Sequence, residues 1–443
     1  MSLAVAESGQ LRASFDKHWA GRGTQPGWLA ALRERAMANF ERRGWPTTRD
    51  EAWRFTNVAE IARSAFASPP PHPREAAAEA LRLSLGASSA GPRAVFVNGR
   101  FAPELSSARG PGVTVESLAA AVESRPGLEA RLGRLVADSA GAFAQLATAF
   151  VEDGALVELA PGTRLAEPLH VIFVSTTGGG APSVSYPRLL LLAGAGSQAT
   201  IVEKFGGPEG QRYLTCAVGE LWLEPGAVVD HYRVQREGRD AFHLASLGVH
   251  LTRDCRYSNL AVSLGARLAR TDIEARLDAP GAECVLDGLY LVDGEQLSDT
   301  HTLIDHAQPH GVSRQLYKGI VAGRGRGVFH GKVLVRAGAQ KTDAHQANKN
   351  LLLSDDALVH STPALEILAD DVKCKHGSTT GQLDRTALFY LRSRGIGEAA
   401  ARDLLSYAFA SDLLGRIRVE ALRAALLAQL HDRLPGAPLE AIA

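Results

Sequence analysis

The stretch YLTCAVGELWL-EPGA, residues 213–227, shows the pattern that runs through the centre of this 443-residue chain. An apolar run of strand length ends at a Glu-Pro-Gly turn, and a Gly-Ala dipeptide then opens the next run. Similar short apolar runs, each bounded by Gly, Pro, Asp or Ser, lie at residues 155–159, 170–174, 189–192 and 351–353. No convincing helical period interrupts them for over 200 residues, so this region is expected to be built of short strands.

The Gly-Ala dipeptide recurs along the whole region. It begins at Gly154, Gly194, Gly226, Gly265, Gly281 and Gly338, and Asp356-Ala357 stands in the same place. If the intervals are whole numbers of turns of a coil, each turn has roughly 18 residues, the size of a β-solenoid rung. A β-sandwich would also give many short strands, but it does not need a glycine that recurs at one corner. The pattern therefore predicts a parallel β-helix over residues 153–376.

Helical segments flank this region on both sides. Residues 1–150 are expected to form a mostly helical domain, because apolar residues from Trp28 to Phe40 recur at three-to-four spacing. A brief strand pair at residues 94–101, with Asn98-Gly99 as its turn, interrupts these helices. Residues 151–380 then form the β-helix core. Residues 381–443 return to helices, the first of them capped by Asp384.

Composition excludes several classes of function. Lys plus Arg equals Asp plus Glu at 48 each, which leaves no basic excess for a nucleic acid backbone. No window approaches 18 uninterrupted apolar residues, so we expect no membrane span and a cytoplasmic protein. The four cysteines lie far apart without a Cys-x-x-Cys pair, which argues against a disulfide framework and against a closed zinc knuckle.

A possible metal-ligand pair lies near the end of the β-rich region, in the sequence ADDVKCKHG at residues 369–377. On a strand, Cys374 and His376 share one face, while Lys373 and Lys375 occupy the other. Same-face neighbours are roughly 6.6 Å apart, too far for one ion but suited to two irons or to a site shared with a second chain. The alternative is that Cys374 is a small buried hydrophobe and His376 a hydrogen-bonded strand residue.

A second group of possible ligands comprises His301, Asp305, His306 and His310. Strand alternation puts His301 and Asp305 on one face and His306 on the other, so fewer than three ligands converge. A structural role is favoured for this group, and a metalloenzyme that uses it remains an alternative. A third possibility is a purely structural solenoid that has no ligand at all.

Several longer motifs resemble those of the SufD family, subunits of the SUF machine for iron-sulfur cluster assembly. They are residues 46–56 (PTTRDEAWRFT), 309–320, 340–344 (QKTDA), 348–354 (NKNLLLS), 369–377 and 389–396 (FYLRSRGI). The form DDVKCKHG followed by LFYLRSRGI is similar to SufD rather than to its paralogue SufB. Ser378 departs from the family pattern, in which alanine usually follows His-Gly. The resemblance implies a right-handed parallel β-helix between helical domains, in agreement with the strand pattern.

The resemblance also implies partners and residue roles. SufB would pair with the end of the β-helix, and the ATPase SufC would dock on the C-terminal helices, for which we expect Leu404, Leu405 and Phe409 as anchors. The interface histidine of the family corresponds to His376, a candidate ligand, with Cys374 as a weaker candidate. The chain is expected to be a non-catalytic scaffold without a tightly bound cofactor. An iron-sulfur cluster would form transiently at its interface with SufB. Without SufB, we expect a homodimer.

Overall fold

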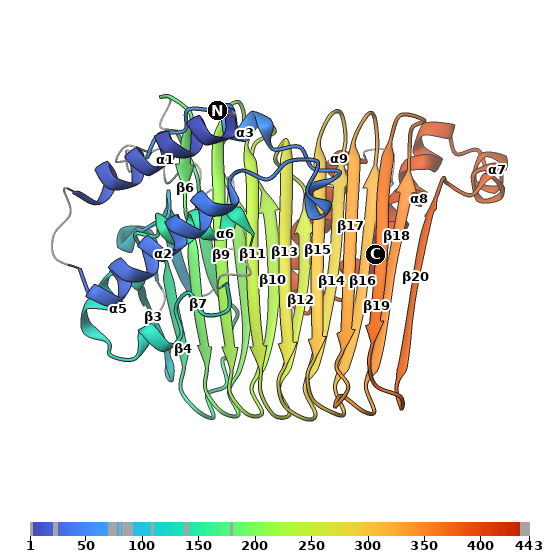
Figure 1. The fold of residues 1–443 in the computed structure, drawn as a ribbon. Coiled ribbons are helices and arrows are strands. Elements are labelled where there is room, and N and C mark those ends of the chain that lie inside the picture. The colour runs from blue at the N-terminus through green and yellow to red at the C-terminus, as the bar shows by residue number, and fades with distance from the viewer. Residues whose placement is uncertain are drawn as a thin grey trace.

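The computed structural model forms an elongated coil of β-strands with helices near both of its ends (Figure 1). It describes residues 3–20, 25–69, 78, 81, 92–107, 110–136, 141–177 and 180–434. The described helices are α1 (Leu3–Ala20), α2 (Gly27–Arg43), α3 (Ala59–Arg63), α5 (Leu118–Ser124), α6 (Ala142–Ala149), α7 (Arg385–Ser393), α8 (Glu398–Leu414) and α9 (Glu420–Arg433), with short 3₁₀ turns at Glu51–Trp53, Pro103–Leu105 and Leu128–Ala130.

Two sheets form the walls of the coil. What we term the first sheet contains, in spatial order, β19 (Leu358–Ile367), β17 (Arg326–Val335), β15 (Leu297–His306), β13 (Leu268–Leu277), β11 (Phe242–Leu251), β9 (Tyr213–Leu223), β7 (Arg188–Ala193), β4 (Ala155–Leu159) and β3 (Val113–Ser117), with β6 (Ser183–Ser185) beside β9. The second sheet contains β2 (Arg100–Phe101), β1 (Arg93–Val97), β5 (Leu169–Val174), β8 (Gln198–Gly206), β10 (Val228–Arg236), β12 (Arg256–Ser263), β14 (Glu283–Val292), β16 (Val312–Val321), β18 (Asp343–Leu352) and β20 (Lys373–Gly381).

The coil is a parallel β-helix, as the sequence pattern predicted. Successive strands of each sheet pair in parallel, and the chain alternates between the two sheets from β7 to β20. Val228 pairs with Arg256, and Val312 pairs with Asp343, so one turn takes 28 to 31 residues in these rungs. The expected turn of roughly 18 residues is therefore wrong.

The reason for this error is the position of the Gly-Ala dipeptides. Gly226 and Gly281 precede strands of the second sheet, whereas Gly265 precedes β13 of the first, so the dipeptides lie at both corners of a flattened coil. Gly226 and Gly281 have φ of 71° and 76°, a conformation that costs glycine little. The alanines that follow them are fully buried, and their small side chains fit the narrow corner.

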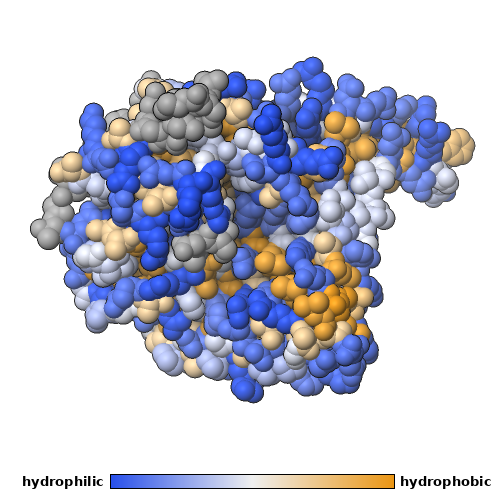
Figure 2. Space-filling view, viewed as in Figure 1, coloured by the Kyte–Doolittle hydropathy of each residue, from blue (hydrophilic) through white to orange (hydrophobic). Residues whose placement is uncertain are grey.

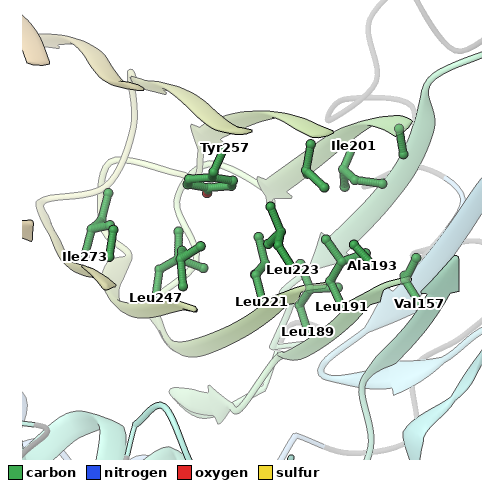
Figure 3. Close-up of a cluster of buried hydrophobic side chains, with 14 of the residues drawn as sticks. Val157, Leu189, Leu191, Ala193, Ile201, Leu221, Leu223, Leu247, Tyr257 and Ile273 are labelled. Carbon is green, nitrogen blue, oxygen red and sulfur yellow. The ribbon is translucent and has the colours of Figure 1, made fainter. Parts of the chain in front are cut away.

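Apolar side chains fill the interior of the early and middle rungs. Figure 3 shows residues of the first sheet, among them Leu191, Leu221 and Leu247, facing Ile201 and Tyr257 of the second sheet. Because side chains alternate along each strand, every second residue enters this core and the others face outward.

The N-terminal segment contributes strands as well as helices. Asn98 and Gly99, with φ of 52° and 79°, form the turn between β1 and β2, so the expected strand pair is confirmed. β1 then pairs in parallel with β5, and β3 pairs with β4. The two sheets therefore extend into the segment before residue 151, which we expected to be mostly helical with a brief strand pair. These early strands cover edges that would otherwise be unpaired.

Helices α8 and α9 pack on the outer face of the second sheet. Tyr407, Leu413 and other apolar residues of these helices form one buried cluster with Val234 and Leu289. The ammonium of Lys318 on β16 donates to the Phe409 carbonyl oxygen at 2.9 Å and to the Asp412 carboxylate at 2.5 Å, which joins α8 to the sheet. Among the described helices, none is both long and apolar enough to cross a membrane.

Candidate functional site

Within residues 180–434, no strand covers the C-terminal end of the β-helix, which we call the open end. β20 is the terminal strand of the second sheet and pairs with β18, and β19 is the terminal strand of the first sheet and pairs with β17. Figure 1 shows this end at the right, with α7 projecting beyond it. A terminal strand presents a row of unpaired backbone donors and acceptors, which is a template for another chain.

Cys374 and His376 lie on β20 at this open end, on the face that points into the coil. The same face carries Ser378, whose hydroxyl bonds to the Ser361 hydroxyl of β19 at 2.8 Å. Lys373 and Lys375 occupy the alternate positions. The predicted alternation of ligand-type and charged side chains is therefore present in the structure.

The Cys374 thiol is half-buried at the edge of an apolar cluster that contains Val333, Val335 and Ala344. Desolvation raises the pKa of this thiol, Asp343 raises it further, and a backbone hydrogen bond from Ala344 opposes the shift. At neutral pH the sulfur stays protonated, although a thiolate is the form that binds a metal. Cys374 is thus poorly prepared as a ligand in the isolated chain.

His376, by contrast, is exposed at the mouth of the coil. Its register neighbour on β18 is Gln346, which is buried. A neutral imidazole is a good ligand for iron or zinc, and exposure leaves it accessible to a second chain.

Large apolar side chains are exposed around the same end. Leu358 and Ile367 lie on β19, Leu368 follows that strand, and Phe389 and Tyr390 lie on α7, with exposed fractions between 40% and 73%. Figure 2 shows apolar surface at the lower right, over the ends of β17 and β19 in this view. Leu358 starts β19 and Leu368 follows its end, so these side chains are exposed at both ends of the terminal strand of the first sheet. Exposed apolar residues along a terminal strand are typical of an interaction surface.

We did not predict this apolar surface from the sequence. The residues that point to it are Phe389 and Tyr390, two adjacent large apolar side chains on α7. Helix α7 has apolar residues, yet none of its side chains is buried. Phe389 and Tyr390 on α7 are exposed, and an apolar helix face exposed to solvent is a candidate for contact with another protein.

The expected SufC anchors are only partly available on the surface. Leu404 and Leu405 of α8 are half-buried. Phe409 packs beside the apolar cluster under α8, and the Lys318 ammonium lies 4.8 Å from its ring centroid. Part of the Phe409 side chain therefore stabilises the protein's own fold.

The four residues of the second possible ligand group do not converge. The His301 Nε2 lies 3.1 Å from the Asp299 carboxylate, and Asp305 pairs with Arg336 at 2.8 Å. His306 points to the opposite face, as predicted, and its Nε2 lies 2.9 Å from the Ser313 hydroxyl. Burial lowers the pKa of His306 to about 4, although Asp305 opposes the shift. No group of three or more His, Cys, Asp or Glu side chains suited to a metal ion occurs in the described part of the chain.

The N-terminal motif at residues 46–56 lies as a strap across the outer face of the first sheet. The Thr56 hydroxyl donates to the buried Asp299 carboxylate at 2.6 Å, and Arg270 donates to the same carboxylate at 2.7 Å. The Arg270 guanidinium also lies 3.8 Å from the Trp53 ring centroid. A cavity of about 840 Å³ separates part of the strap from the sheet. Contacts with the strap therefore account for the buried Asp299 and Arg270 of the first sheet. Neither Cys374 nor His376, the predicted ligands on β20, lines this cavity.

Comparison with known proteins supports the resemblance. The model of the SufBD core domain, described as SUF system FeS cluster assembly, matches residues 173–409, and the model of the SufBD N-terminal region matches residues 22–171. A SufBD family protein of Synechocystis is 36% identical over 91% of both chains. The iron-sulfur cluster assembly protein SufD of Escherichia coli is 32% identical over 89% of this chain and 90% of its own length. The chain therefore belongs to the SufBD family of iron-sulfur cluster assembly proteins.

Proposed function

We propose that this chain is a non-catalytic scaffold subunit of the SUF machine, which pairs through its open end with a second β-helix of the SufB type. The β20 edge supports this proposal most strongly, because β20 carries His376 and ends the same coil as β19, where Leu358 and Leu368 are exposed. Edge strands add to one another through main-chain hydrogen bonds, and flanking apolar residues supply affinity. The proposed place of action is the cytoplasm.

The C-terminal helices would dock the SufC ATPase. Leu404 and Leu405 on α8 remain the proposed anchors, together with the exposed part of Phe409. Because Lys318 ties α8 to β16, a movement of α8 would reach the strands near the open end. In this scheme SufC hydrolyses ATP, the two β-helices shift, and their interface admits iron and sulfide.

His376 would contribute a ligand to the cluster that forms at this interface, and Cys374 would be secondary. The cluster is the product of assembly, so no tightly bound cofactor is proposed for the isolated chain. An exposed histidine at the mouth of the coil fits this role better than a protonated, half-buried thiol.

The test of this role is His376→Asn in the complex of this chain with SufB and SufC. Asparagine keeps a hydrogen-bonding edge but is a poor ligand for iron. We expect the complex to assemble, ATP hydrolysis to stay near normal, and cluster formation to be abolished, with Cys374→Ser doing less harm. Normal cluster loading would refute the proposed role, and so would a defect confined to assembly of the complex.

Without SufB, the same edge would pair with a second copy of this chain. A two-fold axis at β20 would bring two copies of the Cys374 and His376 motif together. Light scattering at micromolar concentration should then show a dimer. A monomer at that concentration would count against the use of β20 as a pairing edge.

A further inference from the structure

The interior of the β-helix changes character toward its open end. The inward positions of the second sheet that lead to His376 are occupied by Gln315 on β16 and Gln346 on β18, which are in register with each other and with His376 on β20. One rung earlier, the same column holds Leu286. A column of two amides therefore ends at the proposed ligand.

Hydrogen bonds orient this column. Gln346 Nε2 donates to Gln315 Oε1 at 2.5 Å, and Gln315 Nε2 donates to the Thr302 hydroxyl at 2.6 Å. These bonds engage the amide nitrogens of both glutamines and run away from the open end. Gln346 Oε1 is left buried without a hydrogen-bond partner.

A buried amide oxygen without a donor is unusual in proteins. Across the interior, Gln346 lies against Gly331, which has no side chain to donate, and a Cβ there would lie 2.2 Å from Gln346 Nε2. The next member of the column is His376, one strand spacing away at about 4.8 Å. Rotation of the imidazole about its side-chain bonds can bring a ring N–H to this oxygen.

We propose that Gln346 is a positioning residue for His376, whose imidazole N–H donates to Gln346 Oε1. This inference rests on the proposed function of His376 and adds the partner that orients it. A ring nitrogen that donates to a fixed acceptor holds one neutral tautomer, which leaves the other nitrogen as a lone-pair ligand toward the interface. Partners of this kind commonly orient metal-binding histidines and raise their affinity for the metal.

The test measures the His376 tautomer directly, without a metal or a cluster. The full chain is labelled with ¹⁵N-histidine, and long-range ¹H–¹⁵N spectra are recorded at a pH where imidazole is neutral, with His376→Asn used for assignment. We expect one tautomer in the wild type, a mixture in Gln346→Met, and one tautomer again in Gln346→Glu, which keeps an acceptor oxygen. A mixture in the wild type, or the same spectrum in all three proteins, would overturn the proposal.

Two controls separate positioning from packing. His345 is adjacent to Gln346 on the outer face of β18 and lies 3.2 Å from Asp343, so its tautomer should not change in any variant. Gln315→Met disrupts the same column one rung farther from His376 and should affect His376 less than Gln346→Met does. Equal effects of the two Met variants would mean that general packing of the column, not the Gln346 oxygen, acts on His376.

The complex then shows whether this orientation matters for assembly. Loss of such an orienting partner typically costs 10- to 100-fold in metal affinity or activity, so we expect about a tenfold loss of cluster formation in Gln346→Met and recovery in Gln346→Glu. If the tautomer changes in Gln346→Met and cluster formation does not, the hydrogen bond exists but His376 is not a ligand. That outcome would refute the proposed function of His376 and leave the hydrogen bond to Gln346 standing.

Discussion

Replacement of Leu358 and Leu368 by alanine should weaken binding of the SufB-type partner while the isolated chain keeps its fold. These leucines are 47% and 58% exposed, so about half of each side chain is available for burial at the open end. Full burial of a leucine contributes about 1.5 to 3 kcal/mol, which makes the two exposed halves worth roughly 1.5 to 3 kcal/mol together. Since 1.4 kcal/mol is a factor of ten, the dissociation constant should rise about tenfold to a hundredfold.

Isothermal titration of the double variant with the purified partner would measure this change, and thermal unfolding of each protein would check the fold. Leu105→Ala is the matched control, because Leu105 is half-buried near the N-terminal end of the β-helix, away from β19. An unchanged dissociation constant in the double variant, or an equal change in the control, would refute the assignment of the interface to the open end.

Three further predictions concern other parts of the chain. Leu404→Ala with Leu405→Ala should weaken SufC binding in a pull-down. Phe409→Ala should lower the unfolding temperature more than this double variant does, because its ring packs over Lys318; an equal loss in the two proteins would contradict this. Arg270→Met should lower the free energy of unfolding, measured with denaturant, by about 3 to 5 kcal/mol, because the buried Asp299 carboxylate loses its guanidinium partner. A loss below about 1 kcal/mol would show that Thr56 and His301 alone stabilise this carboxylate. Because the pKa of His306 is lowered to about 4 in the folded state, its contribution to stability is present above pH 6.5 and is lost as pH falls toward 4, by roughly 3 kcal/mol. His306→Asn should therefore make the free energy of unfolding less dependent on pH between about 6.5 and 4. An unchanged pH dependence in this variant would exclude His306 as its source.

Local chemistry made much of the architecture predictable. Short apolar runs that end at turn residues indicated strands, and the helical spacing after Asp384 indicated the C-terminal helices, where the Asp384 carboxylate accepts from the Thr386 amide at 2.7 Å. The alternation of Cys374 and His376 with lysines was also readable, because strand geometry places every second side chain on the same face. These features depend on neighbours in the sequence.

The length of one turn could not be read from the sequence, because glycine and alanine suit both corners of the coil and only pairing between rungs shows which corner each one occupies. The sequence predicted the strand at residues 94–97, but only its parallel pairing with β5 shows that this strand belongs to the second sheet.

The sequence by itself determined the strand character of the centre, the face that Cys374 and His376 share, and membership in the SufBD family. Only the tertiary structure decided that this face lies on the last described strand of the coil, next to β19 with its exposed Leu358 and Leu368. It also placed Gln346, whose buried Oε1 has no hydrogen-bond partner, in register with His376, 30 residues away in the sequence. The physical reason is that exposure and hydrogen-bond partners depend on which strands stack on which, and this stacking is a property of the whole coil.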